Sequence, residues 1–330
     1  MQNGGWDTFL ELLRAGLWEQ DLRLPEAPDT AGWTQLMQLA RSQSVMGLFL
    51  RGLARLPDDQ QAPEAVQQDL LRWRTALERT HERHSRVQAL LLEELAAAGV
   101  HPVVQKGSEV AKYYACPPMR QAGDIDLYCP EFDRARSLAP QARLASDGAA
   151  VFTRDGVLVE LHPHYYDVHL DPSRLPAPGT PCGELLLLSS HIFKHAIGAG
   201  VGYKQLCDLT LALTRLEGRY DKSELETALR DAGLLRWHQL LCSLLVEDLG
   251  LDPACCLEGF RPGHPESLRR IVRKAGSFGK NQRKQEHKKP AWQRKAAIAG
   301  TFLRRLPFSL RFGAREALAT MGELARGNLK

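Results

Sequence analysis

The spacing of hydrophobic residues along the chain predicts helices at both ends. Leucines recur at helical spacing over residues 5–98, and the run APEAVQQDLLRWRTALERTHERHSRVQALLLEELAAAG ends at a glycine, Gly99, as helices commonly do. From Gly183 onward the pattern is helical again. It predicts helices over 184–197, 203–216, 222–232, 234–248, 266–275, 291–304 and 313–325.

Between these helical regions the pattern changes to the alternation typical of β-strands. VHPVVQ and DIDLYC predict short strands, and AAVFTR and VLVELHPH predict two more, joined by a type I′ turn at Asp155-Gly156. SEVAKYYA predicts a brief helix capped by Ser108, and EFDRARSLAPQARLA predicts another helix. The proline-rich stretch DPSRLPAPGTPCG marks a boundary.

These patterns predict an α+β fold in three regions. We expect an N-terminal helical region over 1–99, a core with a small mixed sheet over 100–172, and a C-terminal helical domain over 183–330. The composition, 44% hydrophobic and 25% charged over 330 residues, is typical of a soluble globular protein. The start of the chain lacks the features of a signal peptide, and the densest apolar run, ELLLLSSHIF, is too short to span a bilayer.

The cysteines and the charges narrow the class of protein. Seven cysteines without a CxxC spacing favour reduced thiols in a cytoplasmic protein. Residues 269–295 carry eleven Lys/Arg and one acid, Glu286, a net charge of +10 against +4 for the whole chain. This basic segment is either a solvated loop, a polyanion contact or an aid to substrate binding. With Phe278 and Trp292 as its only aromatic residues, it does not favour a nucleic-acid channel.

The stretch GDIDL places two acids in an apolar strand. Asp124 and Asp126 share one face of the strand because successive side chains point to opposite faces. On the later strand VLVELH, Glu160 alternates with apolar residues in the same way. Unpaired buried carboxylates are costly, and a divalent cation offsets the repulsion between them. Carboxylate oxygens suit Mg²⁺ or Mn²⁺, so these three acids predict a metal site.

Upstream of the acids, Gly107-Ser108 lies where a strand turns into a helix. Backbone N–H groups at such a turn bind phosphate, and a small residue lets the phosphate approach closely. A phosphate-binding turn beside metal-binding acids predicts phosphoryl or nucleotidyl transfer.

The ordered motifs resemble the nucleotidyltransferases of the DNA polymerase β type, which show h-G-[GS], [DE]-h-[DE]-h and h-[DE]-h. The chain supplies KGS at 106–108, DIDL at 124–127 and VEL at 159–161. More closely, QKGSEVAKYY, PPMRQAGDIDL, VELH, HIFKHA and YKQLCDLTLAL resemble the bacterial family of uncharacterised nucleotidyltransferases. The spacing between Ser108 and Asp124 is slightly longer than is usual in the superfamily.

The resemblance implies a reaction and roles for residues. Asp124 and Asp126 would bind two metals, and Glu160 the metal nearest the attacking group. The enzyme would transfer a nucleoside monophosphate from an NTP such as ATP to an acceptor hydroxyl and release pyrophosphate. The nucleotide-binding candidates are Lys106, Gly107, Ser108, Arg120, His191, Lys194 and His195.

Several of these residues also have ordinary structural explanations. Ser108 is equally explained as a helix cap, Arg120 as a salt-bridge partner, and Lys106 as a surface lysine. His162 shares the Glu160 face or packs as a neutral histidine. His191, Lys194 and His195 form one polar helix face, which contacts nucleotide or acceptor, faces solvent or another domain, or, least favoured, holds a metal. Lys204 and Asp208 are spaced as an ion pair along a helix.

Three functions remain open from the sequence. The first is an active nucleotidyltransferase acting on a small molecule, sugar, peptide or protein. The second is a non-catalytic nucleotide-binding or partner-binding module of the antitoxin type, which the intact acid triad disfavours. The third is an RNA-tailing enzyme, which the basic segment suggests.

Overall fold

The computed structural model describes residues 4–145, 148–198, 200–277 and 291–325. It is a mixed α+β structure, 62% helical, with a five-stranded mixed sheet, which confirms the predicted fold class. The helices in chain order are α1 (Gly4–Trp18), α2 (Thr30–Gln43), α3 (Met46–Leu53), α4 (Glu64–Ala97), α5 (Gly107–Ala111), α6 (Phe132–Ser137), α7 (Pro181–Ile197), α8 (Tyr203–Leu216), α9 (Lys222–Asp231), α10 (Leu235–Leu249), α11 (Glu266–Ala275) and α13 (Ala291–Ala325).

The sheet contains the strands predicted from the alternating patterns and one more. Its order is β1 (Val103–Gln105), β2 (Ile125–Tyr128), β5 (Val157–His162), β4 (Ala150–Arg154), β3 (Arg143–Leu144). β2 and β5 pair in parallel, and every other pair is antiparallel. Asp155 and Gly156, between β4 and β5, have φ values of 49° and 76°, which agrees with the predicted type I′ turn.

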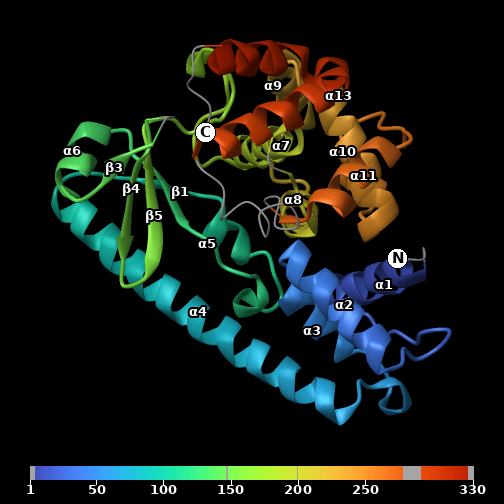
Figure 1. Cartoon of the computed structure of the whole chain (residues 1–330). Helices are drawn as coiled ribbons and strands as arrows, with labels where there is room; N and C mark the ends of the chain where they lie inside the picture. The colour runs from blue at the N-terminus through green and yellow to red at the C-terminus, as the bar shows by residue number, and fades with distance from the viewer. Residues whose placement is uncertain (1–3, 146–147, 199, 278–290, 326–330) are drawn as a thin grey trace.

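One face of the sheet packs on helices, and the other carries the polar residues of β5. Val157, Val159 and Leu161 are buried and pack with residues of α4 and α6. Leu158, Glu160 and His162 alternate with them and are more exposed. Figure 1 shows the long α4 running beneath the sheet and on to the N-terminal helices. Burial of one face therefore fixes the direction in which Glu160 points.

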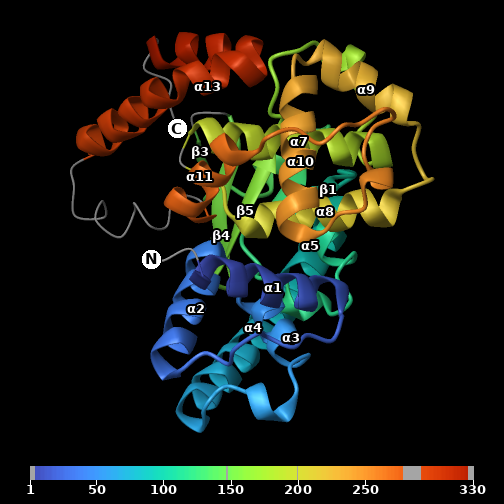
Figure 2. The same cartoon turned by 90° about the vertical axis from the view of Figure 1, so that its right-hand side faces the viewer.

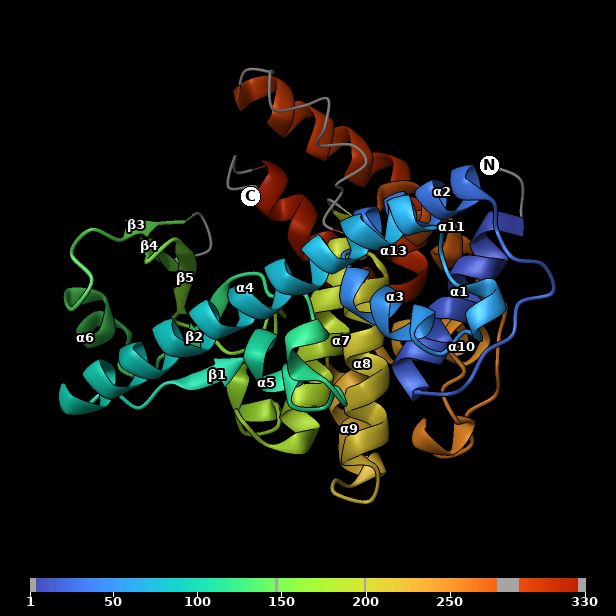
Figure 3. The ribbon, with the colours of Figure 1, turned by 90° about the horizontal axis from the view of Figure 1, so that it is seen from below.

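A second, larger core joins the N-terminal helices to the C-terminal helices. The indole Nε1 of Trp18 in α1 donates a hydrogen bond to the carbonyl of Leu249 at 2.6 Å, and Trp6 packs against Tyr203 of α8 with ring centroids 6.1 Å apart. Residues from both ends of the chain belong to this one cluster. Figures 2 and 3 show α1 beside α10 and α11. The division into regions 1–99, 100–172 and 183–330 remains a prediction, and the packing joins the two helical regions.

Several local predictions were wrong. Ser108 does not cap α5, because Lys106 holds the N-cap position and the Ser108 hydroxyl donates to Gln88 of α4. The predicted helix over EFDRARSLAPQARLA is shorter than expected, since only Phe132–Ser137 is helical and Arg143–Leu144 pairs with β4 as β3.

The predicted helices 291–304 and 313–325 are parts of one element, α13, with a kink at Gly313. Gly313 has φ −162° and ψ 61°, and a Cβ there would lie 2.4 Å from the Phe193 ring, so close packing accounts for the glycine. Of the basic segment, residues 278–290, including Phe278, lie outside the described residues. Within the described part of the chain, no helix has the length and apolar character needed to cross a bilayer.

Candidate metal and nucleotide site

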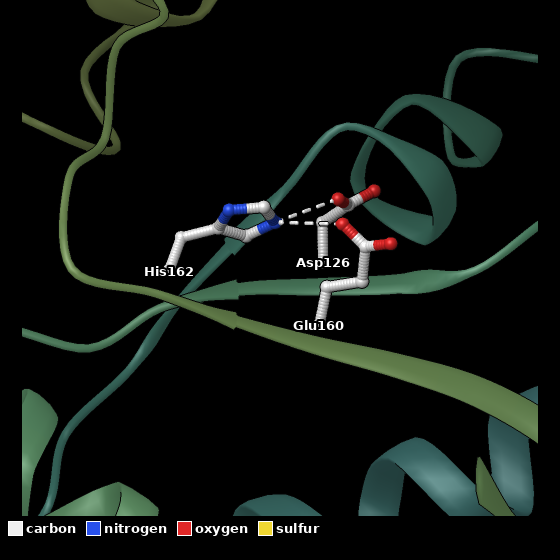
Figure 4. A group of neighbouring side chains, drawn as sticks. All are labelled: Asp126, Glu160 and His162. Carbon is white, nitrogen blue, oxygen red and sulfur yellow. Dashed lines mark hydrogen bonds and ion pairs between the residues drawn. The ribbon is translucent and has the colours of Figure 1, made fainter. Parts of the chain in front are cut away.

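Two carboxylates and an imidazole meet on the face of the parallel strand pair that is turned away from α4. Asp126 of β2 lies opposite Glu160 of β5 in the strand register. Nε2 of His162 is 2.9 Å from Oδ1 of Asp126 and 3.6 Å from Oε2 of Glu160. A ligand atom of each residue lies within 4.8 Å of the other two, as Figure 4 shows. Parallel pairing thus brings together acids that are far apart in the sequence.

The two carboxyl groups have opposite pKa shifts. Burial alone would raise the pKa of Asp126, but the ammonium of Lys106 and the hydrogen bond with His162 outweigh burial and hold that pKa below its usual range. Burial raises the pKa of Glu160, and the negative charges of Asp126 and Asp124 raise it further. Glu160 therefore lies in a site with excess negative charge.

The turn between β1 and α5 approaches this site closely. Lys106 and Gly107 both have positive φ values, 46° and 44°, which bend the backbone sharply before the short helix. The Nζ of Lys106 lies 3.4 Å from Oδ1 of Asp126 and 3.5 Å from Nδ1 of His191. Burial lowers the pKa of Lys106, but Asp126, Asp167 and Asp124 more than compensate, so the net shift is upward. Lys106 is therefore a partly enclosed cation and not a surface lysine.

A cleft with an empty volume of about 470 Å³ opens beside the turn and the acids. One wall comes from the turn and β2, and the other from α7 and α8. Asp124 lines the cleft, although it lies outside the three-residue group around Asp126. The lining residues are Lys106, Gly107, Arg120, Gly123, Asp124, Asp126, Leu188, His191, Ile192, Lys204, Gln205 and Asp208.

Arg120 borders the cleft but its guanidinium is held by a buried carboxylate. Nε and Nη2 of Arg120 each donate to an Asp208 oxygen at 2.8 Å, and the Tyr114 hydroxyl donates to the same carboxylate at 2.7 Å. Burial would lower the pKa of Arg120, but the Asp208 charge and hydrogen bonds raise it overall. The bidentate geometry matches the structural explanation of Arg120 as a salt-bridge partner.

The polar residues of α7 form a network around Asp167, which lies in the loop after β5. Lys194 donates to Oδ1 of Asp167 at 2.6 Å, and Nδ1 of His191 lies 3.2 Å from Oδ2. Nε2 of His191 is 3.1 Å from Nε2 of His195. Burial would raise the pKa of Asp167, but the His191 hydrogen bond and the Lys194 charge hold it well below its usual value. The predicted face of α7 therefore points toward the site, and only His191 of the three lines the cleft.

Residues 29–250 match the family described as uncharacterised nucleotidyltransferase. The chain belongs to this family. The matched range contains every predicted site residue, and it excludes α11 and α13. No curated protein and no solved structure gives a significant match.

Within this family member, the structure brings most of the predicted site residues to one place. Lys106, Gly107, Asp124, Asp126 and His191 line the cleft, and Glu160 joins Asp126 at its edge. Ser108 does not line it, because its hydroxyl is bonded to Gln88.

Two residues at or beside the cleft were not predicted as site residues from the sequence. Asp167 follows β5 in the stretch HPHYYDVHL, and no spacing rule separates it from other loop acids. Its one signal is its position beyond the carboxyl end of a strand parallel to β2, where sites in such sheets gather. Lys204 of α8 lines the cleft opposite Gly123, where a Cβ would lie 3.6 Å from Nζ. The predicted pairing of Lys204 with Asp208 stays a prediction, and the Asp208 oxygens also accept hydrogen bonds from Arg120 and Tyr114.

The residues around Asp126 suit a divalent cation. Two carboxylate oxygens and one imidazole nitrogen converge from adjacent strands, and burial together with the charges of Asp126 and Asp124 raises the pKa of Glu160, charges that a cation would neutralise. A donor set made mainly of oxygen atoms fits Mg²⁺ or Mn²⁺. An imidazole ligand is more usual for Mn²⁺ than for Mg²⁺. His191 and His195 belong to no group of three potential ligands among the residues described.

Proposed function

We propose that this protein transfers a nucleoside monophosphate from an NTP to an acceptor hydroxyl in a reaction that depends on a divalent cation. The observation that carries the proposal is the pairing of Asp126 with Glu160 on adjacent parallel strands, at the edge of a cleft that Lys106 and Lys204 also line. Membership of a nucleotidyltransferase family supports the same reaction class.

In this proposal Asp126 and Glu160 hold Mg²⁺ or Mn²⁺ with help from His162, and Asp124 completes the acidic side of the cleft. A bound cation would neutralise phosphate charge and polarise the phosphoryl group under attack. The acceptor oxygen forms a bond to the α-phosphorus, and the bond from that phosphorus to the pyrophosphate oxygen breaks. The acceptor hydroxyl gives up its proton in this step, and solvent water takes the proton up.

In this proposal two cations of the cleft contact the triphosphate. Lys106 lies on the turn that precedes α5, and Lys204 lies on the opposite wall. Ammonium groups at such positions stabilise the charge that develops on the leaving pyrophosphate. His191, oriented by Asp167, lies between the α7 network and Lys106 and is available to contact the nucleotide or the acceptor.

The direct test uses the full chain with each of the four NTPs labelled at the α-phosphate, together with MgCl₂ or MnCl₂ and a cell lysate. The proposal predicts label transfer to a lysate component with release of pyrophosphate, and mass spectrometry of that component identifies the acceptor. Asp126→Asn is predicted to reduce transfer at least about a hundredfold. Glu109→Gln, a change at an exposed acid of α5 paired only with Lys112 among the contacts described, is the matched control.

Two results would contradict the proposal. Equal transfer by wild type and Asp126→Asn would remove the carboxylates from the mechanism. Binding of an NTP in calorimetry without any transfer or pyrophosphate release would favour a non-catalytic nucleotide-binding module. Cytoplasmic location and bacterial origin stay predictions from the sequence, and the label-transfer experiment does not test them.

A further inference from the structure

Exposed aliphatic side chains are concentrated on α13. Nine large hydrophobic side chains are exposed among the residues described, and four of them belong to this one helix. They are Leu303, Leu310, Leu318 and Met321, with exposed fractions of 58%, 42%, 59% and 36%. Leu303 and Leu310 are seven residues apart, so they lie on the same side of the helix. Exposed apolar side chains that share one side of a helix, unlike singly scattered ones, indicate a candidate interaction site.

The opposite side of α13 is packed against the protein, which fixes the orientation of the helix. Phe302 is buried, and Phe308 packs against Trp237 of α10 with ring centroids 6.3 Å apart. Arg305 donates to the carbonyls of Ala196 and Gly198 at the end of α7, at 2.7 and 2.9 Å. Figure 2 shows α13 along the outer edge of the molecule. The aromatic residues Phe302, Phe308 and Phe312 therefore contribute to packing, and the outer side presents aliphatic residues.

Leu303 and Leu310 stand beside arginines, in a stretch of the sequence that contains no acid. Arg304 and Arg311 are exposed and follow Leu303 and Leu310 directly in the sequence. Residues 287–315 contain eight Lys/Arg and no Asp or Glu. The next acid, Glu316, is buried and binds His169 at 2.7 Å. The outer face of α13, defined by Leu303, Arg304, Leu310 and Arg311 before the kink at Gly313, is thus both apolar and cationic.

We infer that the outer face of α13 binds the surface of a bilayer that contains anionic lipids. Leucines beside arginines on one exposed helix face fit the boundary between headgroups and acyl chains, where apolar side chains enter the bilayer and cations meet lipid phosphates. The same face fits a nucleic acid less well, because single strands are held by aromatic stacking, and Phe302, Phe308 and Phe312 pack inward.

A second copy of the chain is a poorer occupant. Face-to-face contact would bring the arginines of one face close to those of the other, and like charges repel across such a contact. The face also lies beyond residues 29–250, so it is an addition to the part of the chain that matches the family and is independent of the proposed reaction.

The test is flotation of the full chain with liposomes of phosphatidylcholine alone and of phosphatidylcholine with 30 mol% phosphatidylglycerol. We expect binding to the anionic liposomes and at least tenfold weaker binding to the neutral ones. Leu303→Glu/Leu310→Glu and Arg304→Ala/Arg311→Ala should each reduce anionic binding at least tenfold. Leu71→Glu, at a 63% exposed leucine on α4, should leave it unchanged. Thermal melts of each variant confirm that it is folded.

Three results would overturn the inference. One is the absence of flotation with either liposome. Another is flotation that salt abolishes and that the leucine substitutions do not change, in a protein that binds tRNA as tightly as it binds anionic liposomes. This result would indicate a general contact with polyanions. The third is a concentration-dependent dimer in light scattering that Leu303→Glu/Leu310→Glu converts to monomer, because the face would then bind a second copy.

Discussion

The ammonium of Lys106 lies 3.4 Å from Oδ1 of Asp126, in a part of the cleft where both side chains are largely shielded from water. The lysine reaches this position because the backbone at 106 and 107 adopts positive φ values before α5. A buried carboxylate is costly without a partner, so Lys106 contributes to the stability of the fold as well as to the charge of the cleft.

Replacing Lys106 with methionine is expected to lower the free energy of unfolding by about 3 kcal/mol at pH 7, because the Asp126 charge loses its main compensating partner. Added MnCl₂ should restore part of the loss, since a cation supplies positive charge at the same carboxylate. Urea unfolding with and without Mn²⁺ measures both effects. Lys112→Met, which breaks an exposed pair with Glu109, should cost less than about 1 kcal/mol. Equal losses in the two variants would contradict this role for Lys106.

Removing the Arg120 side chain is expected to destabilise the fold more than it weakens nucleotide binding. The buried Asp208 carboxylate accepts both bonds from Arg120, so Arg120→Ala leaves an uncompensated charge and should cost about 3–5 kcal/mol. Arg154→Ala, which breaks a more exposed pair with Glu94, should cost about 1 kcal/mol or less. Chemical unfolding provides the measurement. A stable Arg120→Ala protein with a greatly raised KM for NTP would instead make Arg120 a triphosphate contact.

Gly107→Ala is expected to affect nucleotide binding through the backbone. A Cβ at Gly107 has room, with Asp124 O at 3.5 Å, but the φ of 44° is unfavourable for alanine by about 1–2 kcal/mol. The turn should shift, and the KM for NTP should rise several-fold. Gly218→Ala is matched, because Gly218 has φ 72° with open space around it and does not line the cleft. Gly218→Ala should lower the free energy of unfolding by a similar amount and leave the KM for NTP unchanged. A raised KM in both variants would indicate a global effect on the fold.

The stability of the protein is expected to fall between pH 7.5 and pH 5 partly because of His238. Burial lowers the pKa of His238 to about 4, whereas an unfolded histidine has a pKa near 6.5. Because the unfolded state binds a proton that the folded state excludes, stability is lost as pH falls below about 6.5. Because the two pKa values differ, proton binding to the unfolded state lowers the free energy of unfolding by about 2 kcal/mol at pH 5. Urea unfolding of wild type and His238→Asn should show this increment only in wild type; an equal pH dependence in both would contradict it.

Turns, strand faces and helix ends could be predicted from the sequence where one residue type or one spacing determines the local backbone conformation. Asp155-Gly156 predicted the hairpin because both positions need positive φ values, and the alternation in VLVELH predicted which face Glu160 occupies. The predicted ranges of α8 and α11 agree with the structure because each begins and ends at clear breaks in the apolar pattern.

Contacts between segments that are far apart in the chain could not be predicted from the sequence. The bond between Arg120 and Asp208 joins residues 88 positions apart, and it depends on how α8 packs beside the sheet. The shared core of α1 and α10 likewise depends on which of several similar apolar helix faces meet. Asp167 acquires its role from the positions of His191 and Lys194, which no local pattern around it indicates.

Binding of Mn²⁺, followed by electron paramagnetic resonance in the wild-type protein and in Glu160→Gln, tests most directly whether the strand-paired acids form a metal site. We expect wild type to bind Mn²⁺ and Glu160→Gln to bind it at least tenfold more weakly, because the variant loses one of two converging carboxylates. Glu131→Gln, at an exposed acid outside the cleft, should behave as wild type. Equal Mn²⁺ affinity in wild type and Glu160→Gln would contradict the proposed site.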